Sequence, residues 1–140
     1  MLKTKVMTIA NKLVGKGCSR SVAMVKAWVI VKAAALRVKV VGVTKLFRQE
    51  AIRSIQEVGA SNLEVTFKHE RYNRYDSNAI AVYSAIKGQA IMLIGYLPKA
   101  VAGVVAPLMD KGAIPTVKSI NVVGGFNQYV RYGVRLQVTI

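Results

Sequence analysis

The stretch of the chain that decides its fold is residues 63–83, LEVTFKHERYNRYDSNAIAVY. Its first seven residues alternate in polarity, which is typical of a strand with one buried face. That face holds four side chains: Leu63, Val65, Phe67 and His69. A polar loop rich in turn formers follows at residues 71–77, and residues 78–83 are largely apolar again. The stretch therefore predicts two strands joined by a polar loop.

Further strands and two short helices are predicted on either side of this stretch. Runs of β-branched and other apolar residues predict strands at 38–43, 91–96, 115–123 and 129–140. Helices are expected near 49–58 and from Pro98 to Gly112, with a kink or a break at Pro107. The chain is therefore predicted to be an α+β protein with a small, curled OB-like or SH3-like β-barrel of about six strands and two short helices.

A helical hairpin is predicted ahead of the barrel. Residues 4–14 place apolar side chains at helical spacing, and Gly15 and Gly17 can end that helix. A second helix can begin at Ser19 or Ser21 and is apolar on most of its sides. Such a helix must be covered by its neighbour, by the following domain or by another copy of the chain. We therefore divide the chain into residues 1–36, a basic hairpin, and residues 37–140, the barrel domain.

The charge of the chain is strongly positive and unevenly distributed. The net charge is +15 over 140 residues, and the isoelectric point is about 10.3. Residues 1–40 contain nine Lys and Arg residues and no acidic residue, whereas residues 41–140 contain twelve basic and six acidic residues. A surface this positive attracts polyanions, namely DNA, RNA or anionic lipid.

Several classes of protein are disfavoured by composition. The single cysteine, Cys18, excludes an internal disulfide and fits a reducing cytoplasm, so we expect a cytoplasmic protein of a bacterium or a phage-infected cell. The apolar run from Val22 to Val43 is interrupted by four cations, which disfavours a membrane span.

The sequence also lacks candidate residues for catalysis and for metal binding. His69 is the only histidine, it falls on the apolar strand face, and we expect it to be packed rather than catalytic. One histidine and one cysteine cannot complete a zinc site, and the carboxylates are scattered along the chain. No glycine-rich phosphate loop precedes a helix. We therefore expect no enzyme, no metal and no cofactor, and keep a small nuclease only as a remote alternative.

The loop at residues 71–78 is the most informative part of the chain for function. It interleaves two arginines with two tyrosines, and tyrosine rings can stack on bases while arginines meet phosphates. Asp76 and Asn78 admit two roles, because such side chains either shape turns or bind a ligand. The loop favours a nucleic-acid-binding site.

Two separate blocks of the chain resemble the HIRAN domain family. Residues 74–82, RYDSNAIAV, are similar to the N-x-Y-D-x-N-A-I-x-V signature of that family, and residues 40–43 match its first strand. Residues 94–99, IGYLPK, followed by residues 106–112, APLMDKG, resemble its second block. The resemblance covers about residues 37–140, and the two blocks have the expected order and spacing.

The resemblance implies a small barrel that binds the free 3′ end of single-stranded DNA, as the domain does in a eukaryotic fork-remodelling helicase. It implies that Tyr75 stacks on the terminal base, that Asp76 accepts a hydrogen bond from the 3′ hydroxyl and that Lys99 neutralises a phosphate. Tyr96 stands where the helicase has a histidine. The remaining candidate nucleic-acid contacts are Asn78, Arg71, Arg74, Lys45, Phe47, Arg48 and Tyr132.

Residues 1–36 lie outside the resemblance, and two interpretations of them stay open. The basic hairpin is either a DNA-binding helix pair or an arm through which the chain forms homo-oligomers. Our first hypothesis is therefore a module that binds single-stranded DNA and prefers free 3′-hydroxyl ends. The alternative is a structural or assembly protein, of a phage or a bacterium, that oligomerises through its N-terminal helices.

Overall fold

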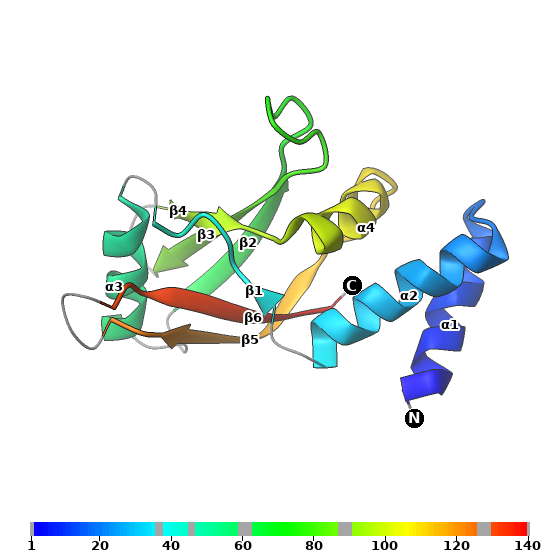
Figure 1. Ribbon diagram of the computed structural model, residues 1–140, viewed down its shortest axis with the longest axis horizontal. Helices are drawn as coiled ribbons and strands as arrows, with labels where there is room; N and C mark the ends of the chain where they lie inside the picture. The colour runs from blue at the N-terminus through cyan, green and yellow to red at the C-terminus, as the bar shows by residue number, and fades with distance from the viewer. Residues whose placement is uncertain are drawn as a thin grey trace.

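A computed structural model describes residues 2–35, 38–44, 47–58, 63–86, 91–125 and 130–139 of the chain. Within these residues, helices and strands follow the predicted order. The elements are α1 (Leu2–Gly15), α2 (Arg20–Ala35), β1 (Val38–Lys39), α3 (Arg48–Val58), β2 (Leu63–His69), β3 (Ile80–Ile86), β4 (Ile91–Tyr96), α4 (Lys99–Asp110), β5 (Thr116–Val123) and β6 (Gly133–Thr139). The α+β class and the N-terminal helices are confirmed (Figure 1).

The strands form two antiparallel sheets of three, in the orders β1-β6-β5 and β2-β3-β4. The sheets are joined on one side by an isolated bridge, in which Val41 and Tyr96 exchange main-chain hydrogen bonds of 2.8 and 2.9 Å. On the other side, no ladder joins β2 to β5 within the described residues. The sheets are therefore curled toward each other but are not closed, and a closed barrel is not what the structure shows.

The main core lies between the two sheets and is covered by α3 and α4. Ile52 of α3, Ile80 of β3, Ile94 of β4 and Leu136 of β6 are fully buried there. Each such side chain stabilises the fold by about 1.5–3 kcal/mol through removal of apolar surface from water. β2 shows the alternating exposure that its sequence predicts, whereas five of the seven residues of β3, the central strand, are buried.

The N-terminal hairpin packs against α4 (Figure 1). Val6, Ala10 and Leu13 of α1 share one apolar cluster with α2, and Val104 and Leu108 of α4 complete it. α2 also contacts β6. The neighbouring helix and the following domain thus both cover α2, which explains how a helix that is apolar on most sides is accommodated.

Two local predictions need correction. α4 runs without interruption past Pro107, because the ring removes only one main-chain hydrogen bond and the buried stripe on either side keeps the helix in place. β1 is only two residues long, because Val41 pairs with Tyr96 of β4 and no longer with β6, and the chain then turns at Gly42, whose φ is +71°. Gly42 therefore separates the first strand from α3. Within the residues that the structure describes, no helix is long and apolar enough to cross a membrane.

Candidate nucleic-acid interface

The loop between β2 and β3 is built around the side chain of Asn73. Its Oδ1 accepts hydrogen bonds from the main-chain N–H groups of Tyr75 (2.9 Å) and Asp76 (3.1 Å), and its Nδ2 donates to Oε1 of Glu70 (3.0 Å). Asp76 Oδ1 in turn accepts from the N–H of Asn78 at 2.9 Å. These bonds fix the loop, which projects away from the sheets (green in Figure 1). Asp76 therefore has the turn-shaping role that its residue type predicts.

A cleft of about 470 Å³ opens where this loop meets the start of α4, the end of β4 and the segment before α3. We call it the Tyr75 cleft. Its lining residues are Val41, Gly42, Arg48, Asn73, Tyr75, Asp76, Ala79, Tyr96, Leu97 and Lys99. Five of the predicted site residues, drawn from four parts of the chain, are thus brought to one place.

The Tyr75 ring is available to a ligand, because 91% of the residue's surface is exposed. Its main chain is nevertheless held by Asn73. A fixed backbone with a free ring is a suitable stacking platform, and base–aromatic stacking contributes about 1–3 kcal/mol per base. Tyr72 is 99% exposed but does not line the cleft.

Arg48 forms one wall of the cleft and is held in a defined position. Its Nη1 donates to the carbonyl oxygen of Gly42 at 2.7 Å, and its Cζ lies 5.3 Å from the centroid of the Tyr96 ring. A Cβ at Gly42 would lie 3.0 Å from Arg48 Nη1, so glycine leaves room for the guanidinium as well as allowing the turn. Arg48 Nε is buried and has no hydrogen-bond partner within the described residues.

Tyr96 keeps its proton at neutral pH. Burial raises the pKa of its hydroxyl, the carboxylate of Glu70 raises it further, and Arg48 acts in the opposite direction. The hydroxyl therefore stays neutral and keeps its hydrogen-bonding capacity. Lys99 lies across the cleft at the first turn of α4, next to main-chain N–H groups that no side chain caps. Helix N-termini with neighbouring cations attract anions.

Asp76 supplies the opposite charge. One carboxylate oxygen is engaged by Asn78, and within the described residues no hydrogen bond to the other is found. The cleft thus combines an exposed aromatic ring, a carboxylate oxygen and two cations. This arrangement suits a ligand that carries a base, a hydroxyl donor and a phosphate.

Arg71 lies outside the cleft and supports the loop instead. Its Nη2 is 2.8 Å from Oδ1 of Asp110, which also lies 2.9 Å from Nδ1 of His69. His69 Nε2 is 2.7 Å from the carbonyl oxygen of Ser77. The hydrogen bond from His69, followed by that from Arg71, lowers the pKa of Asp110. His69 is therefore a packed residue that ties the loop to α4, as its place on the strand predicts.

The other predicted contacts that the structure describes do not line the Tyr75 cleft. Phe47 and Arg74 are exposed, and Asn78 is half-buried. The Tyr132 ring packs on Gly125, and Gln49 binds the Tyr132 main chain. Lys45 falls outside the described residues.

Sequence reasoning missed several residues of the cleft and its surroundings. Asn73 could have been found, since it is the first residue of the N-x-Y-D signature and asparagine side chains often bond to the main chain two residues on. Gly42 interrupts a run of valines, and glycine is the residue that most readily takes a positive φ. Val41, Ala79 and Leu97 carry no comparable signal, because only the folding of the two sheets brings them to the cleft.

The described residues bring no cluster of metal ligands together. In the described ranges, no group of three or more His, Cys, Asp or Glu side chains could hold a metal ion.

Comparison with known proteins places the chain in a family. The family model of the HIRAN domain matches residues 34–139. No curated protein matches the chain in sequence. A crystal structure of a protein from Lactobacillus plantarum is 21% identical, covers 74% of this chain and 92% of its own, and superposes with a TM-score of 0.47. That similarity is weak, whereas the domain match spans most of the chain and implies DNA binding in general.

Proposed function

Because the chain belongs to the HIRAN domain family, whose members are DNA-binding rather than catalytic domains, we propose that the Tyr75 cleft binds the 3′ end of single-stranded DNA. One observation carries the proposal. A single cleft gathers an exposed tyrosine, a carboxylate and two cations from three separate parts of the chain. Each of these groups matches one chemical feature of a DNA end.

The terminal hydroxyl is the feature that Asp76 recognises. Its free carboxylate oxygen accepts a hydrogen bond from the 3′ hydroxyl, and such charge-assisted bonds are about twice as strong as neutral ones. A 3′ phosphate would instead place negative charge against the carboxylate. Asp76 therefore favours a free hydroxyl end and disfavours a phosphorylated end.

The base and the phosphates are bound by the rest of the cleft. Tyr75 stacks on the terminal base without sequence preference. Arg48 and Lys99 neutralise phosphates next to the end, which makes the affinity dependent on salt. Tyr96 holds the Arg48 guanidinium in place and offers its hydroxyl to the sugar-phosphate chain.

The test compares two thymidine 10-mers that differ only in having a 3′ hydroxyl or a 3′ phosphate. Fluorescence anisotropy with a label at the 5′ end measures both affinities. We expect the hydroxyl end to bind about tenfold more tightly, which corresponds to about 1.4 kcal/mol. Equal affinities would rule out end recognition and leave general DNA binding. An RNA strand of the same length shows whether the sugar is also selected.

The decisive variant is Asp76→Asn. It keeps an oxygen that accepts the N–H of Asn78, so the loop retains its turn, but it removes the negative charge. We expect the preference for the hydroxyl end to fall while the affinity for the phosphate end rises. Glu64→Gln is the matched control, because Glu64 is an exposed carboxylate that lies outside the cleft.

A second candidate function is self-association through the N-terminal hairpin. Val22 and Val25 are one helical turn apart on α2 and remain 46% and 65% exposed. Val25→Asp should then convert an oligomer into a monomer in light scattering. A monomeric wild-type chain at the highest concentration tested would eliminate this candidate.

A further inference from the structure

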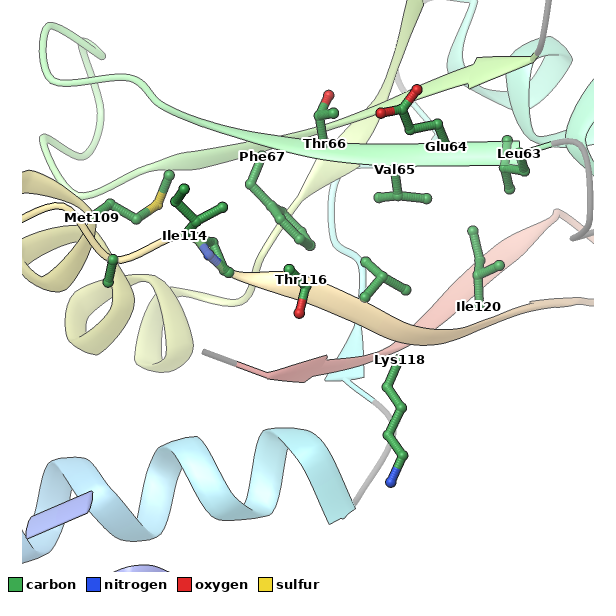
Figure 2. A pocket seen from close by; sticks show the side chains of 13 residues that line it. Leu63, Glu64, Val65, Thr66, Phe67, Met109, Ile114, Thr116, Lys118 and Ile120 are labelled. Atoms are coloured by element: carbon green, nitrogen blue, oxygen red, sulfur yellow. The ribbon is translucent and has the colours of Figure 1, made fainter. Parts of the chain in front are cut away.

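A second cavity, of about 680 Å³, lies between β2 and β5 beside the C-terminal end of α4. We call it the seam cavity; residues 63–67, Met109, residues 113–118 and Ile120 line it. Figure 2 shows Leu63 and Phe67 pointing from β2 toward β5, with Ile114 and Ile120 near them. The proposed DNA site does not use this cavity, and its interior is mainly apolar.

The edge of β2 runs along this cavity. Five consecutive residues of β2 line it, which requires that the cavity follow the strand's edge rather than only one of its faces. The N–H of Glu70 donates to the carbonyl of Ala79, and main-chain groups alternate in direction along an antiparallel strand. The main-chain groups of Leu63, Val65 and Phe67 therefore point away from β3.

β2 is open to pairing, whereas β5 is protected. The β2–β3 ladder runs over seven consecutive pairs with no irregularity, and no other described strand pairs with β2. The ladder of β5 shifts register between Val117 and Ser119, so Lys118 interrupts its edge. Bulges and edge lysines are common devices against unwanted pairing. The free row of donors and acceptors on β2 lacks a bulge of this kind.

We propose that the edge of β2 binds an extended strand from a partner protein, whose alternate apolar side chains enter the seam cavity. A polypeptide main chain satisfies a row of alternating N–H and C=O groups, and a nucleic acid does not. The net charge of +15 favours a partner of the opposite charge. The partner strand is therefore acidic at the positions that face solvent, and its addition joins the two sheets.

The apolar side chains at the mouth of the seam cavity support this choice of partner. Ile114 is 78% exposed at the mouth of the cavity, close to Phe67 and Met109. An apolar side chain of the partner would cover it. The outward side chains of β2 are polar, namely Glu64, Thr66 and Lys68, so the added strand keeps its own polar face in water.

The test uses an acetylated and amidated octapeptide of alternating glutamate and valine, titrated into the full chain. Calorimetry measures the affinity, and amide NMR locates the site. We expect the signals of residues 63–67 to shift and their hydrogen exchange to slow. The same peptide with alternate main-chain amides N-methylated, so that it cannot pair, should bind at least about tenfold more weakly. Equal affinity of the two peptides, or shifts confined to the Tyr75 cleft, would overturn the proposal.

Two variants separate this edge from the rest of the surface. Ile114→Asp places a carboxylate at the mouth of the cavity and should weaken peptide binding at least about tenfold, because that charge loses its water. Ile91→Asp, at a comparably exposed position of β4, should leave it unchanged. Both variants should keep the wild-type affinity for single-stranded DNA, which shows that they are folded. Self-association that only Ile114→Asp abolishes would assign the edge to a second copy and overturn the partner-strand proposal.

Discussion

The guanidinium of Arg48 lies over the ring of Tyr96, with 5.3 Å between Arg48 Cζ and the ring centroid. The two residues come from α3 and β4, which are far apart in the sequence. Cation–π contacts of this kind contribute about 0.5–2 kcal/mol, depending on how far the pair is removed from water. The contact holds a cation at the edge of the Tyr75 cleft in a single orientation.

Replacing Arg48 by lysine separates its charge from its shape. Arg48→Lys keeps the positive charge but loses the planar group and the bond to Gly42. We expect DNA affinity to fall about fivefold, with an unchanged salt dependence, since the number of neutralised phosphates stays the same. Arg48→Gln should in addition reduce the slope of log affinity against log salt by about one. Arg53→Lys on the same helix is the control, because Arg53 is exposed and pairs with Glu57 on the solvent side of α3. An equal loss in that variant would contradict a specific role of Arg48.

Tyr75 and Tyr72 form a matched pair of exposed tyrosines on one loop. Only Tyr75 lines the cleft, so Tyr75→Ala should lower the affinity for a single strand about tenfold through loss of base stacking. Tyr72→Ala should change it less than about twofold. Anisotropy titrations at one fixed salt concentration measure both. A larger effect of Tyr72→Ala would place the base elsewhere on the loop.

Local patterns in the sequence predict much of this fold. The alternation in residues 63–69 gives β2 and its inward face, and the order of all elements follows from similar patterns. Whether the two sheets close into a barrel could not be predicted, because it depends on whether the edges of β2 and β5 pair, and these strands are far apart in the sequence. The elements that pack on α2 could not be predicted either, since a helix that is apolar on most sides does not indicate on which side its neighbours lie.

The residues of the candidate site also fall into those that the sequence predicts correctly and those that it does not. Tyr75, Asp76, Tyr96 and Lys99 can be selected from the family signature, and the structure brings them to one cleft. Arg71 fits the same pattern of interleaved charges, yet it pairs with Asp110 of α4. Residue type alone cannot distinguish a cation that meets a ligand from one that meets a carboxylate, because the carboxylate comes from a distant helix.

The raised pKa of Tyr96 predicts a loss of stability in alkali. Burial favours the neutral hydroxyl in the folded chain, so the folded pKa lies above the ordinary value of 10.0. The stabilising contribution is complete below pH 10 and is lost as pH rises through the folded pKa. Urea unfolding between pH 8 and about 11 should therefore show a smaller decline for Tyr96→Phe than for the wild type. Tyr72→Phe, which changes an exposed ring, should decline as the wild type does.

The lowered pKa of Asp110 predicts the opposite dependence in acid. Its hydrogen bonds to His69 and Arg71 stabilise the carboxylate, so this contribution is present above pH 3.8 and is lost as pH falls through the folded pKa. Asp110→Asn should be less stable than the wild type at pH 7, and the difference should shrink below pH 3.8. Urea unfolding at pH 7 and at pH 3 measures it. Glu57→Gln, on an exposed ion pair, serves as the control and should show almost no difference at either pH.

Replacing glycine by alanine should have opposite effects on stability at two positions of the chain. A Cβ at Gly95 would lie 2.5 Å from Val40 Cγ1 and 2.6 Å from the carbonyl oxygen of Val41, which forms the bridge between the sheets. Gly95→Ala should therefore lower the free energy of unfolding by about 1–3 kcal/mol or more, because main-chain atoms must move. It should also weaken DNA binding, since Val41 and Tyr96 line the Tyr75 cleft. Gly103 of α4 has no atom within 4 Å of the same position, so Gly103→Ala should raise stability by about 0.5–1 kcal/mol through its higher helix propensity. Thermal and urea unfolding of the two variants measure both effects. A stable Gly95→Ala variant with wild-type DNA affinity would contradict the prediction, because it would show that the bridge between the sheets can be disturbed without consequence for the site.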